Sequence, residues 1–156
     1  MSLPSTDTLD FDFAVRRVIY DHSLRAGQPP TSAQAAQALG AAQPASLSAL
    51  RRLAEAHVLI LQPESGEILM ANPFSAVPTP FPITTPTQTY YGNCIWDALS
   101  AIAMLGHAQG AVIRTACPDC GFVLEVTVRD GPATAPPSLI HFALPAARWW
   151  DDIVFA

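Results

Sequence analysis

The thiol of Cys94 and the carboxyl group of Asp97 have the residue types and the spacing for chemistry on a small ligand. Asn93 can cap a helix that is predicted to run to Leu105 and to end at Gly106. The unpaired N–H groups and the dipole of its first turn favour a thiolate at Cys94, and Asp97 lies one turn further on the same face. The spacing thus predicts a soft nucleophile beside a proton carrier. A structural role is the alternative, because Cys is common as a small buried residue and Asp is common in a first helical turn.

Two further thiols, Cys117 and Cys120, lie in the sequence CPDCG at the turn of a predicted hairpin. This pattern resembles a zinc-ribbon knuckle, in which a tight turn points two thiolates at one metal. A closed zinc site needs four ligands, so Cys94 and a histidine such as His141 would have to complete it. Structural zinc is therefore an alternative for these cysteines. A redox-active pair is not favoured, because the motif lies in a turn and not at a helix N-terminus.

The histidines lack the short helical spacing of metal hydrolases. They are His22, His57, His107 and His141. His141 lies in an apolar predicted strand and is expected to be a core residue. Trp149 and Trp150 are likewise expected to pack in the core, with one ring near the surface. No phosphate-binding loop or serine nucleophile elbow occurs in the sequence.

Three helical patterns and a hairpin are predicted in the first part of the chain. Thr31 and Gln34 have the spacing of a capping box, and Gly27 and Gly40 are helix stops. The elements follow the order of a winged helix, which we predict for residues 1–72. The helices are expected at 11–26, 31–40 and 46–57, and the strands at 58–61 and 67–71.

A proline-rich stretch separates this region from a second module. Five prolines fall within residues 72–86, and they predict an extended connector at 73–86 with no helix or central strand. The second module, 87–156, is expected to be a small, mainly antiparallel sheet packed with one or two helices, which makes the fold class α+β. Its strands are expected at 87–91, 110–116, 122–129 and 139–144, and its helices at 93–105 and 145–152.

The charge balance argues against a nucleic-acid partner. The formal net charge is −5, and residues 1–75 contain five Arg against seven acidic residues. The third helix offers only Arg51 and Arg52 for phosphate contacts, so the winged-helix region is expected to pack or to cover a substrate. The chain starts without a signal-like segment and has no apolar run long enough to span a bilayer. With three cysteines, an odd number, it is expected to be a cytoplasmic protein with reduced thiols and no membrane partner.

The stretch from Tyr91 to Leu99, YGNCIWDAL, resembles the Y-x-x-C-x-x-D-x-L segment of organomercurial (alkylmercury) lyases. The resemblance implies that Cys94 attacks mercury and that Asp97 delivers a proton to the departing carbon. Cys117 is similar to a further cysteine in the same hairpin of that family, where its role is structural. The family's closing strand and helix resemble the sequence around His141, Phe142, Ala143 and Trp149. Members also begin with a winged-helix-like module, so the resemblance spans most of the chain.

The sequence departs from the family pattern where a second catalytic cysteine is expected. Residues 136–140 read PPSLI and carry no thiol, and the chain ends at Ala156 where the family continues with more sheet. Mercury(II) is soft and prefers sulfur ligands in pairs, so Cys117, Cys120 or a small external thiol would have to supply the second sulfur. We therefore predict an alkylmercury-lyase-like protein that needs no cofactor and has mercury as its substrate metal. The alternative is a non-catalytic relative that binds a soft metal or small ligand as a sensor or accessory protein.

Overall fold

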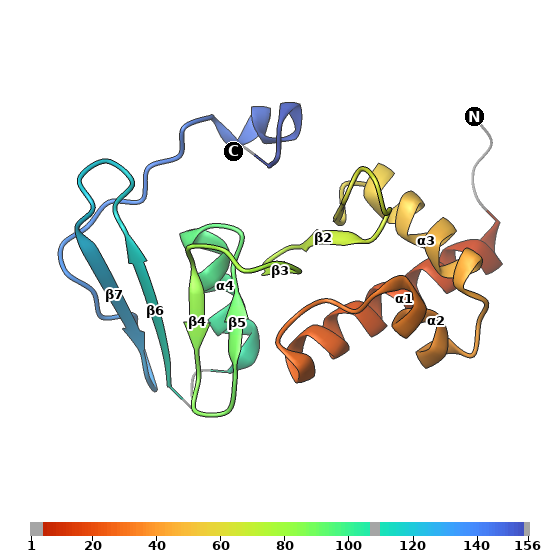
Figure 1. Cartoon of the computed structure of the whole chain (residues 1–156), viewed down its shortest axis with the longest axis horizontal. Helices are drawn as coiled ribbons and strands as arrows, with labels where there is room; N and C mark the ends of the chain where they lie inside the picture. Colours follow the sequence, from red (N-terminus) through yellow and green to blue (C-terminus); the bar gives the residue numbers. More distant parts are fainter. Residues whose placement is uncertain (1–4, 107–109, 155–156) are drawn as a thin grey trace.

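The computed structural model describes residues 5–106 and 110–154 and places three helices before two small antiparallel sheets (Figure 1). The predicted α+β fold class is confirmed. The three helices and the first sheet follow one another in the predicted order. The helices are α1 (Thr6–Ala26), α2 (Ser32–Leu39) and α3 (Gln43–Glu55), and the sheet contains β1 (Ile60–Leu61), β2 (Ile68–Ala71) and β3 (Phe74–Ser75).

The ends of the first helices follow from local sequence. Helix α1 ends at Gly27, whose φ of 82° lies in the left-handed region that glycine adopts at little cost. Helix α2 begins with the predicted capping box, in which Thr31 and Gln34 satisfy each other's backbone N–H groups. It ends before Gly40, also as predicted. Helix α3 starts earlier than expected, because Pro44 is well suited to the first turn of a helix.

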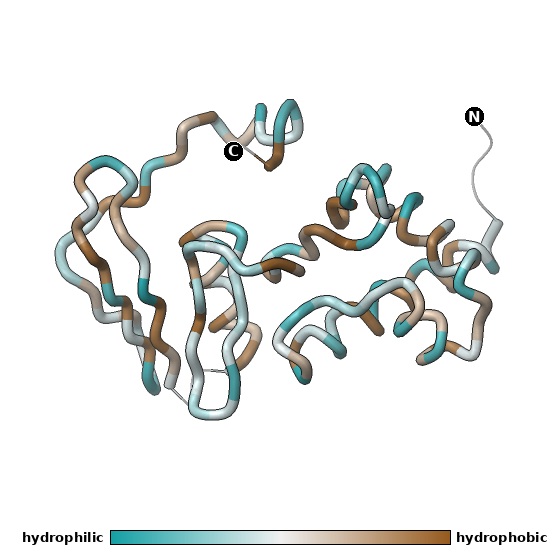
Figure 2. The backbone as a smooth tube through the Cα atoms, viewed as in Figure 1, coloured by the Kyte–Doolittle hydropathy of each residue, from teal (hydrophilic) through white to brown (hydrophobic). Residues whose placement is uncertain are grey.

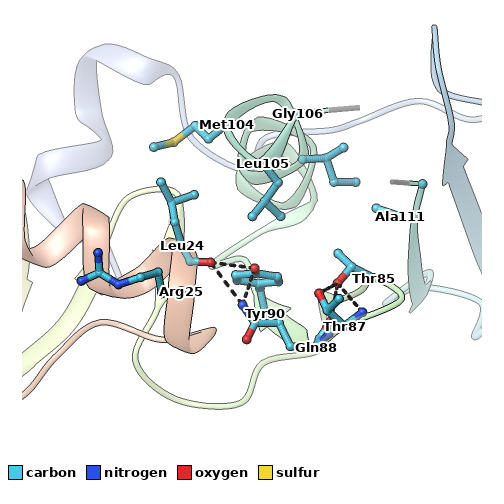
Figure 3. Close-up of a pocket in the computed structure, with 12 residues that line it drawn as sticks. Leu24, Arg25, Thr85, Thr87, Gln88, Tyr90, Met104, Leu105, Gly106 and Ala111 are labelled. Atoms are coloured by element: carbon cyan, nitrogen blue, oxygen red, sulfur yellow. Dashed lines mark hydrogen bonds between the residues drawn. The ribbon is translucent and has the colours of Figure 1, made fainter. Parts of the chain in front are cut away.

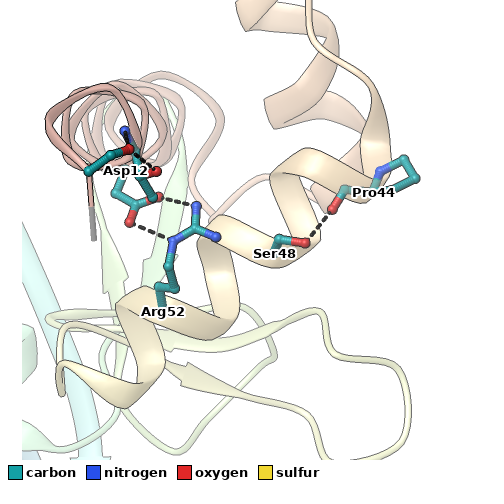
Figure 4. A network of polar contacts seen from close by, with 6 residues as sticks. Asp12, Pro44, Ser48 and Arg52 are labelled. Atoms are coloured by element: carbon teal, nitrogen blue, oxygen red, sulfur yellow. Dashed lines mark hydrogen bonds and ion pairs between the residues drawn. The ribbon is translucent and has the colours of Figure 1, made fainter. Parts of the chain in front are cut away.

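An ion pair joins α1 to α3 beside the apolar core of this region (Figure 4). Arg52 donates two hydrogen bonds to the carboxylate of Asp12, at 2.6 and 2.8 Å. Asp12 is almost fully buried, so its charge needs this partner. The same helices share a core around Val15, Ile19 and Leu50, all of which are inaccessible to solvent. Arg52, one of the two arginines considered for phosphate contacts, is therefore committed to a contact within the protein.

The second sheet is a four-stranded antiparallel sheet in the order β5-β4-β6-β7, and helix α4 packs against it. Its elements are β4 (Pro82–Thr84), β5 (Thr89–Tyr91), α4 (Ile95–Leu105), β6 (Ala111–Ala116) and β7 (Val123–Val128). The predicted β6–β7 pair is confirmed, with six residues of each strand in register. Ile83, Ile113 and Val126 of the sheet meet Ala98 and Ile102 of the helix in one buried cluster.

The expectation that the proline-rich stretch 73–86 contains no central strand is wrong. Strand β4 lies inside the sheet, with β5 on one side and β6 on the other. Pro82 is its first residue and pairs only toward β5, whereas the pairing with β6 involves Ile83 and Thr84. A proline at the start of a strand does not have to donate to both neighbours. A strand of three residues therefore fits between the prolines.

The predicted strand at 139–144 is also absent. This stretch has no regular structure, and Leu139 is 97% exposed although it is apolar. Figure 2 shows hydrophobic residues along this segment, which follows β7 without joining the sheet. Pro136 and Pro137 precede it and limit ladder hydrogen bonding. The final helix is a 3-10 helix, η2 (Ala146–Asp151), and not the α-helix expected at 145–152.

Helix α1 also contacts the second sheet, so the two regions share a packed boundary. The Tyr90 hydroxyl and the Gln88 side-chain amide both donate to the backbone oxygen of Leu24, at the end of α1. Tyr20 and Leu24 pack against the buried cluster between α4 and the sheet. The Tyr20 hydroxyl donates to the backbone oxygen of Asn72 at 3.0 Å. Within the described part of the chain, no helix is both long and apolar enough to cross a membrane.

Candidate functional site

Helix α4 begins with sulfur as its capping group. Cys94 is the N-cap, in extended backbone conformation, and its Sγ accepts a hydrogen bond from the backbone N–H of Asp97 at 3.4 Å. The expectation that Asn93 caps this helix is wrong. The Asn93 side chain instead donates to the side-chain oxygen of Asn72 at 2.9 Å, a partner 21 residues earlier in the chain. Cys94 therefore lies one position earlier in the helix than predicted.

Gly92 allows the start of α4 to lie close to the strand before it. A Cβ atom at position 92 would come within 2.6 Å of the backbone nitrogen of Ala98, which is closer than van der Waals contact. The backbone oxygen of Gly92 accepts from the Thr79 hydroxyl at 2.6 Å, and its N–H donates to Phe81 at 3.1 Å. Gly92 is thus held on both sides, and Cys94, two residues later, takes its position from it.

The side chains of Cys94 and Asp97 face each other across the first turn of α4. The Cys94 thiol donates to Oδ2 of Asp97 with a sulfur–oxygen distance of 3.7 Å. Both residues are partly buried. The structure therefore brings together the thiol and the carboxyl group that the spacing predicts to share one face.

The surroundings of this pair favour the protonated form of the Cys94 thiol. Burial raises the pKa of the Cys94 thiol, and the nearby Asp97 carboxylate raises it further, although the N–H groups of the first turn act in the opposite direction. The expectation that the helix N-terminus favours a thiolate is therefore corrected, because burial and the carboxylate outweigh the N–H groups. Burial also raises the pKa of Asp97, which the Asn93 and Cys94 side chains partly offset. A carboxylate with a raised pKa is a better proton acceptor for a neighbouring thiol.

Replacing Asn93 with Ala should raise the pKa of Asp97 further, because the Asn93 amide is the main group that lowers it. The measurement is a pH titration of the Asp97 carboxyl carbon by NMR. Ser100→Ala is the matched control, because the Ser100 hydroxyl bonds only a backbone oxygen further along the same helix, that of Trp96. An unchanged or lower Asp97 pKa in the Asn93 variant would show that the amide does not act on the carboxylate.

The hairpin cysteines do not join this pair. Cys117 and Cys120 lie in the turn between β6 and β7, and all three cysteines are free thiols. Among residues 5–106 and 110–154, no three His, Cys, Asp or Glu side chains are arranged to hold a metal ion. The zinc site that Cys94 and His141 would complete is therefore not formed in this part of the chain.

His141 does not lie in the core, and one of the two neighbouring tryptophan rings is exposed. His141 is exposed and lies outside any strand, so its assignment to the core is wrong. The Trp149 ring is partly buried and the Trp150 ring is 41% exposed. Trp150 stacks on His57 at the end of α3, with 4.0 Å between ring centroids. His107 lies outside the described residues.

The C-terminal segment contributes aromatic rings next to the thiol–carboxyl pair. The rings of Trp96 and Phe142 lie 6.3 Å apart, and those of Phe142 and Trp149 lie 5.2 Å apart. Trp96 lies between Cys94 and Asp97 in sequence, so this cluster borders the first turn of α4. Sequence reasoning did not identify Asn72 or Phe142 as neighbours of the site. Neither residue has a local signal, because each reaches the first turn of α4 only through the fold.

A partly open cavity lies at the other end of α4 (Figure 3). It has a volume of about 430 Å³ and lies between the end of α1, the β4–β5 hairpin and the last turn of α4. Leu24, Tyr90 and Leu105 are among its lining residues, whereas Cys94 and Asp97 are not. This cavity is therefore separate from the Cys94–Asp97 pair.

Comparisons with known proteins place these observations in a family. A solved structure described as the mercury-bound form of MerB2 is similar to 84% of this chain, with a TM-score of 0.60 and 21% sequence identity. The similarity covers 66% of the MerB2 chain, just under two thirds of its length, and at this identity it shows the fold. None of the curated proteins compared with the chain matches it. The family model for alkylmercury lyase (MerB) matches residues 74–156, a region that contains Cys94, Asp97 and both hairpin cysteines. Because this match covers more than half of the 156 residues, the chain belongs to the alkylmercury lyase family.

Proposed function

We propose that Cys94 and Asp97 cleave carbon–mercury bonds of small organomercury compounds by protonolysis. The observation that carries this proposal is the hydrogen bond from the Cys94 thiol to the Asp97 carboxylate, at 3.7 Å in the first turn of α4. Membership in the alkylmercury lyase family supports mercury as the substrate metal. The pair contains the two groups that the reaction needs, a soft nucleophile for the metal and a proton for the carbon.

The first step transfers mercury to Cys94. A methylmercury cation forms a bond with the Cys94 sulfur, and the thiol proton moves to the Asp97 carboxylate, which becomes a neutral carboxylic acid. The raised pKa of Asp97 favours this step, because burial disfavours the charged carboxylate. The loss of the thiol proton is driven by formation of the strong bond between sulfur and mercury.

The second step breaks the carbon–mercury bond. The thiolate of a small external thiol binds mercury, and the electron pair of the carbon–mercury bond takes the proton from Asp97. Methane leaves, Asp97 returns to the carboxylate form, and mercury(II) is held by Cys94 and the external sulfur. A second external thiol then displaces Cys94, which regains a proton, and mercury leaves as a dithiolate complex. Each cycle therefore consumes two external thiols and restores the resting pair.

An external thiol takes this role because residues 136–140 contain no cysteine and because the hairpin cysteines do not reach the Cys94–Asp97 pair. Trp96, in the first turn of α4, is 54% exposed, which supports the approach of such a partner from this side. Free cysteines and a dependence on small thiols both favour a reducing cytoplasmic setting. The acidic charge balance supports a small-molecule partner and not a nucleic acid.

The reduced protein should release methane from methylmercury in the presence of excess small thiol, and Cys94→Ser should release none above the thiol alone. Gas chromatography of the headspace measures this directly. The Ser variant keeps a hydroxyl that can cap α4 in place of sulfur, so its circular dichroism spectrum should be unchanged. Equal methane release from the two proteins would exclude Cys94 as the nucleophile.

A second candidate function is soft-metal binding without turnover, as in a sensor or accessory protein. The absence of a second thiol beside Cys94 in the described part of the chain favours this candidate. The same experiment separates the two functions. Methylmercury bound to Cys94 without methane release, at any thiol concentration, would identify a binding protein and exclude the lyase.

A further inference from the structure

The β6–β7 turn holds Cys117 and Cys120, here called the hairpin dithiol, in a defined conformation. The backbone N–H of Cys117 donates to Phe122, which closes the hairpin, and the N–H of Gly121 donates back to Cys117, both at 2.9 Å. Gly121 has a φ of 71°, the left-handed conformation that this tight turn requires. The two cysteines are thus brought together by a five-residue turn on a well-paired hairpin.

The electrostatic setting of the hairpin dithiol is the reverse of that at Cys94. Backbone N–H groups of Cys120 and Asp119 point at the Cys117 sulfur and lower the pKa of Cys117, and the Cys120 thiol acts in the same direction. The Asp119 carboxylate opposes them with a smaller effect. Cys120 itself is exposed. Two thiols in one turn, of which Cys120 is exposed and Cys117 partly exposed, are suited to chelating a soft cation.

The two sulfurs of the hairpin dithiol match a cation that needs only two sulfur ligands. Zinc sites in proteins take four ligands. Asp119 lies in the same turn, but among the described residues no three His, Cys, Asp or Glu side chains are arranged to hold a metal ion. Mercury(II) forms stable complexes with two thiolates, so two cysteines in one turn complete its coordination. The number of available ligands thus favours mercury(II) over zinc.

We propose that the hairpin dithiol is a separate binding site for one thiophilic, two-coordinate cation of the mercury(II) type. The site is distinct from the Cys94–Asp97 pair and does not depend on cleavage there. It binds the inorganic cation as a chelate between two sulfurs of the same chain, so one cation takes up both thiols and no second copy of the protein is needed.

The test uses the full chain with Cys94→Ser, which leaves the hairpin cysteines as its only thiols. Titration of the reduced protein with mercury(II) chloride should end at one cation per chain, with loss of both reactive thiols and a new sulfur-to-mercury absorption band in the ultraviolet. Competition with a small monothiol then measures affinity. Adding Cys120→Ser to this variant should weaken mercury(II) retention at least about 100-fold, because a second attachment on the same turn gives a high effective concentration.

The outcomes separate this proposal from its alternatives. Cys120 is exposed, so its Ser variant should keep the fold, and Cys117→Ser in the same background provides an independent second variant. Equal mercury(II) retention by the double variants and the Cys94→Ser protein would overturn the chelate. One cation per two chains, or stoichiometric zinc binding, would overturn the two-coordinate intramolecular site. Methane release plays no part in this test, so failure of the lyase proposal leaves it unaffected.

Discussion

Replacing Asp97 with Asn should abolish methane release while leaving methylmercury bound to Cys94. Asn cannot take the thiol proton and return it to carbon, and positioned proton transfer typically accounts for about 10²–10⁴-fold in rate. We therefore expect turnover to fall by at least about 100-fold. Headspace methane measures turnover, and mass spectrometry of the intact protein measures methylmercury on Cys94. Asp21→Asn, at an exposed position on α1, is the matched control.

The same substitution should not destabilise the protein at neutral pH. The pKa of Asp97 is raised in the folded state, so the folded protein binds this proton more tightly than the unfolded chain does. The protein therefore loses folding stability as the pH rises from 3.8, the ordinary pKa of Asp, through the raised pKa of Asp97 in the folded state. Above that pH range the ionised Asp97 carboxylate lowers the free energy of unfolding. Asn removes this ionisation. The Asn variant should therefore match or exceed the original protein in urea unfolding at pH 7, and its stability should depend less on pH.

These two readouts together identify the role of Asp97. A variant that is both inactive and clearly less stable at pH 7 would indicate that Asp97 mainly supports the fold. A stable variant with undiminished methane release would show that another group delivers the proton. Only loss of turnover without loss of stability fits a proton carrier that is partly buried at some cost to folding.

Replacing Phe74 with Ala should cost about 3–5 kcal/mol of stability, the usual range for a buried aromatic residue. Phe74 is fully buried, and its ring centroid lies 6.0 Å from that of Tyr90 in the core beneath α4. Strand β3, which contains Phe74, pairs with β2 of the first sheet, and Phe74 also bridges to Gly92, the residue after β5 of the second sheet. The substitution should therefore weaken both regions at once. Urea unfolding is the measurement.

Two signals weight the two regions differently. All three tryptophans, Trp96, Trp149 and Trp150, lie in the second region, although Trp150 also stacks on His57 of the first. Helices α1, α2 and α3 supply most of the helical circular dichroism. In the Phe74 variant, the urea midpoints measured by fluorescence and by circular dichroism should fall by the same amount. Phe13→Ala is the control, because Phe13 is 63% exposed and its loss should change stability by less than about 0.5 kcal/mol. A shift of tryptophan fluorescence alone would show that the regions unfold independently.

Patterns local in sequence predicted much of the fold and the core of the candidate site. The helix stops at Gly27 and Gly40, the capping box at Thr31 and the β6–β7 hairpin depend on neighbouring residues, and all are present. The same holds for Cys94 and Asp97, because their contact arises within one helical turn. Such features can be predicted without knowing which residues meet in the folded protein.

The predictions that failed depend on distant residues. Asn93 is a good capping residue by type, but Asn72 engages its side chain, so the cap passes to Cys94. Burial of Cys94 reverses the expected direction of its pKa shift, and burial is a property of the whole fold. Strand β4 forms among prolines because β5 and β6 pair with its remaining N–H groups. The apolar pattern at 139–144 predicts a strand, but this stretch follows Pro136 and Pro137 and does not pair with β7, an edge strand of the sheet.

Helix α1 packs against the core of the region that follows it in the chain. The region that matches the family begins at Phe74, yet part of the cover of its core comes from Tyr20 and Leu24. Tyr20 also holds Asn72, which in turn orients Asn93 beside Asp97. Helix α1 is therefore part of the packing around the family-matching region and not an independent unit. A chain of side-chain contacts thus leads from α1 to the first turn of α4, through Tyr20, Asn72 and Asn93.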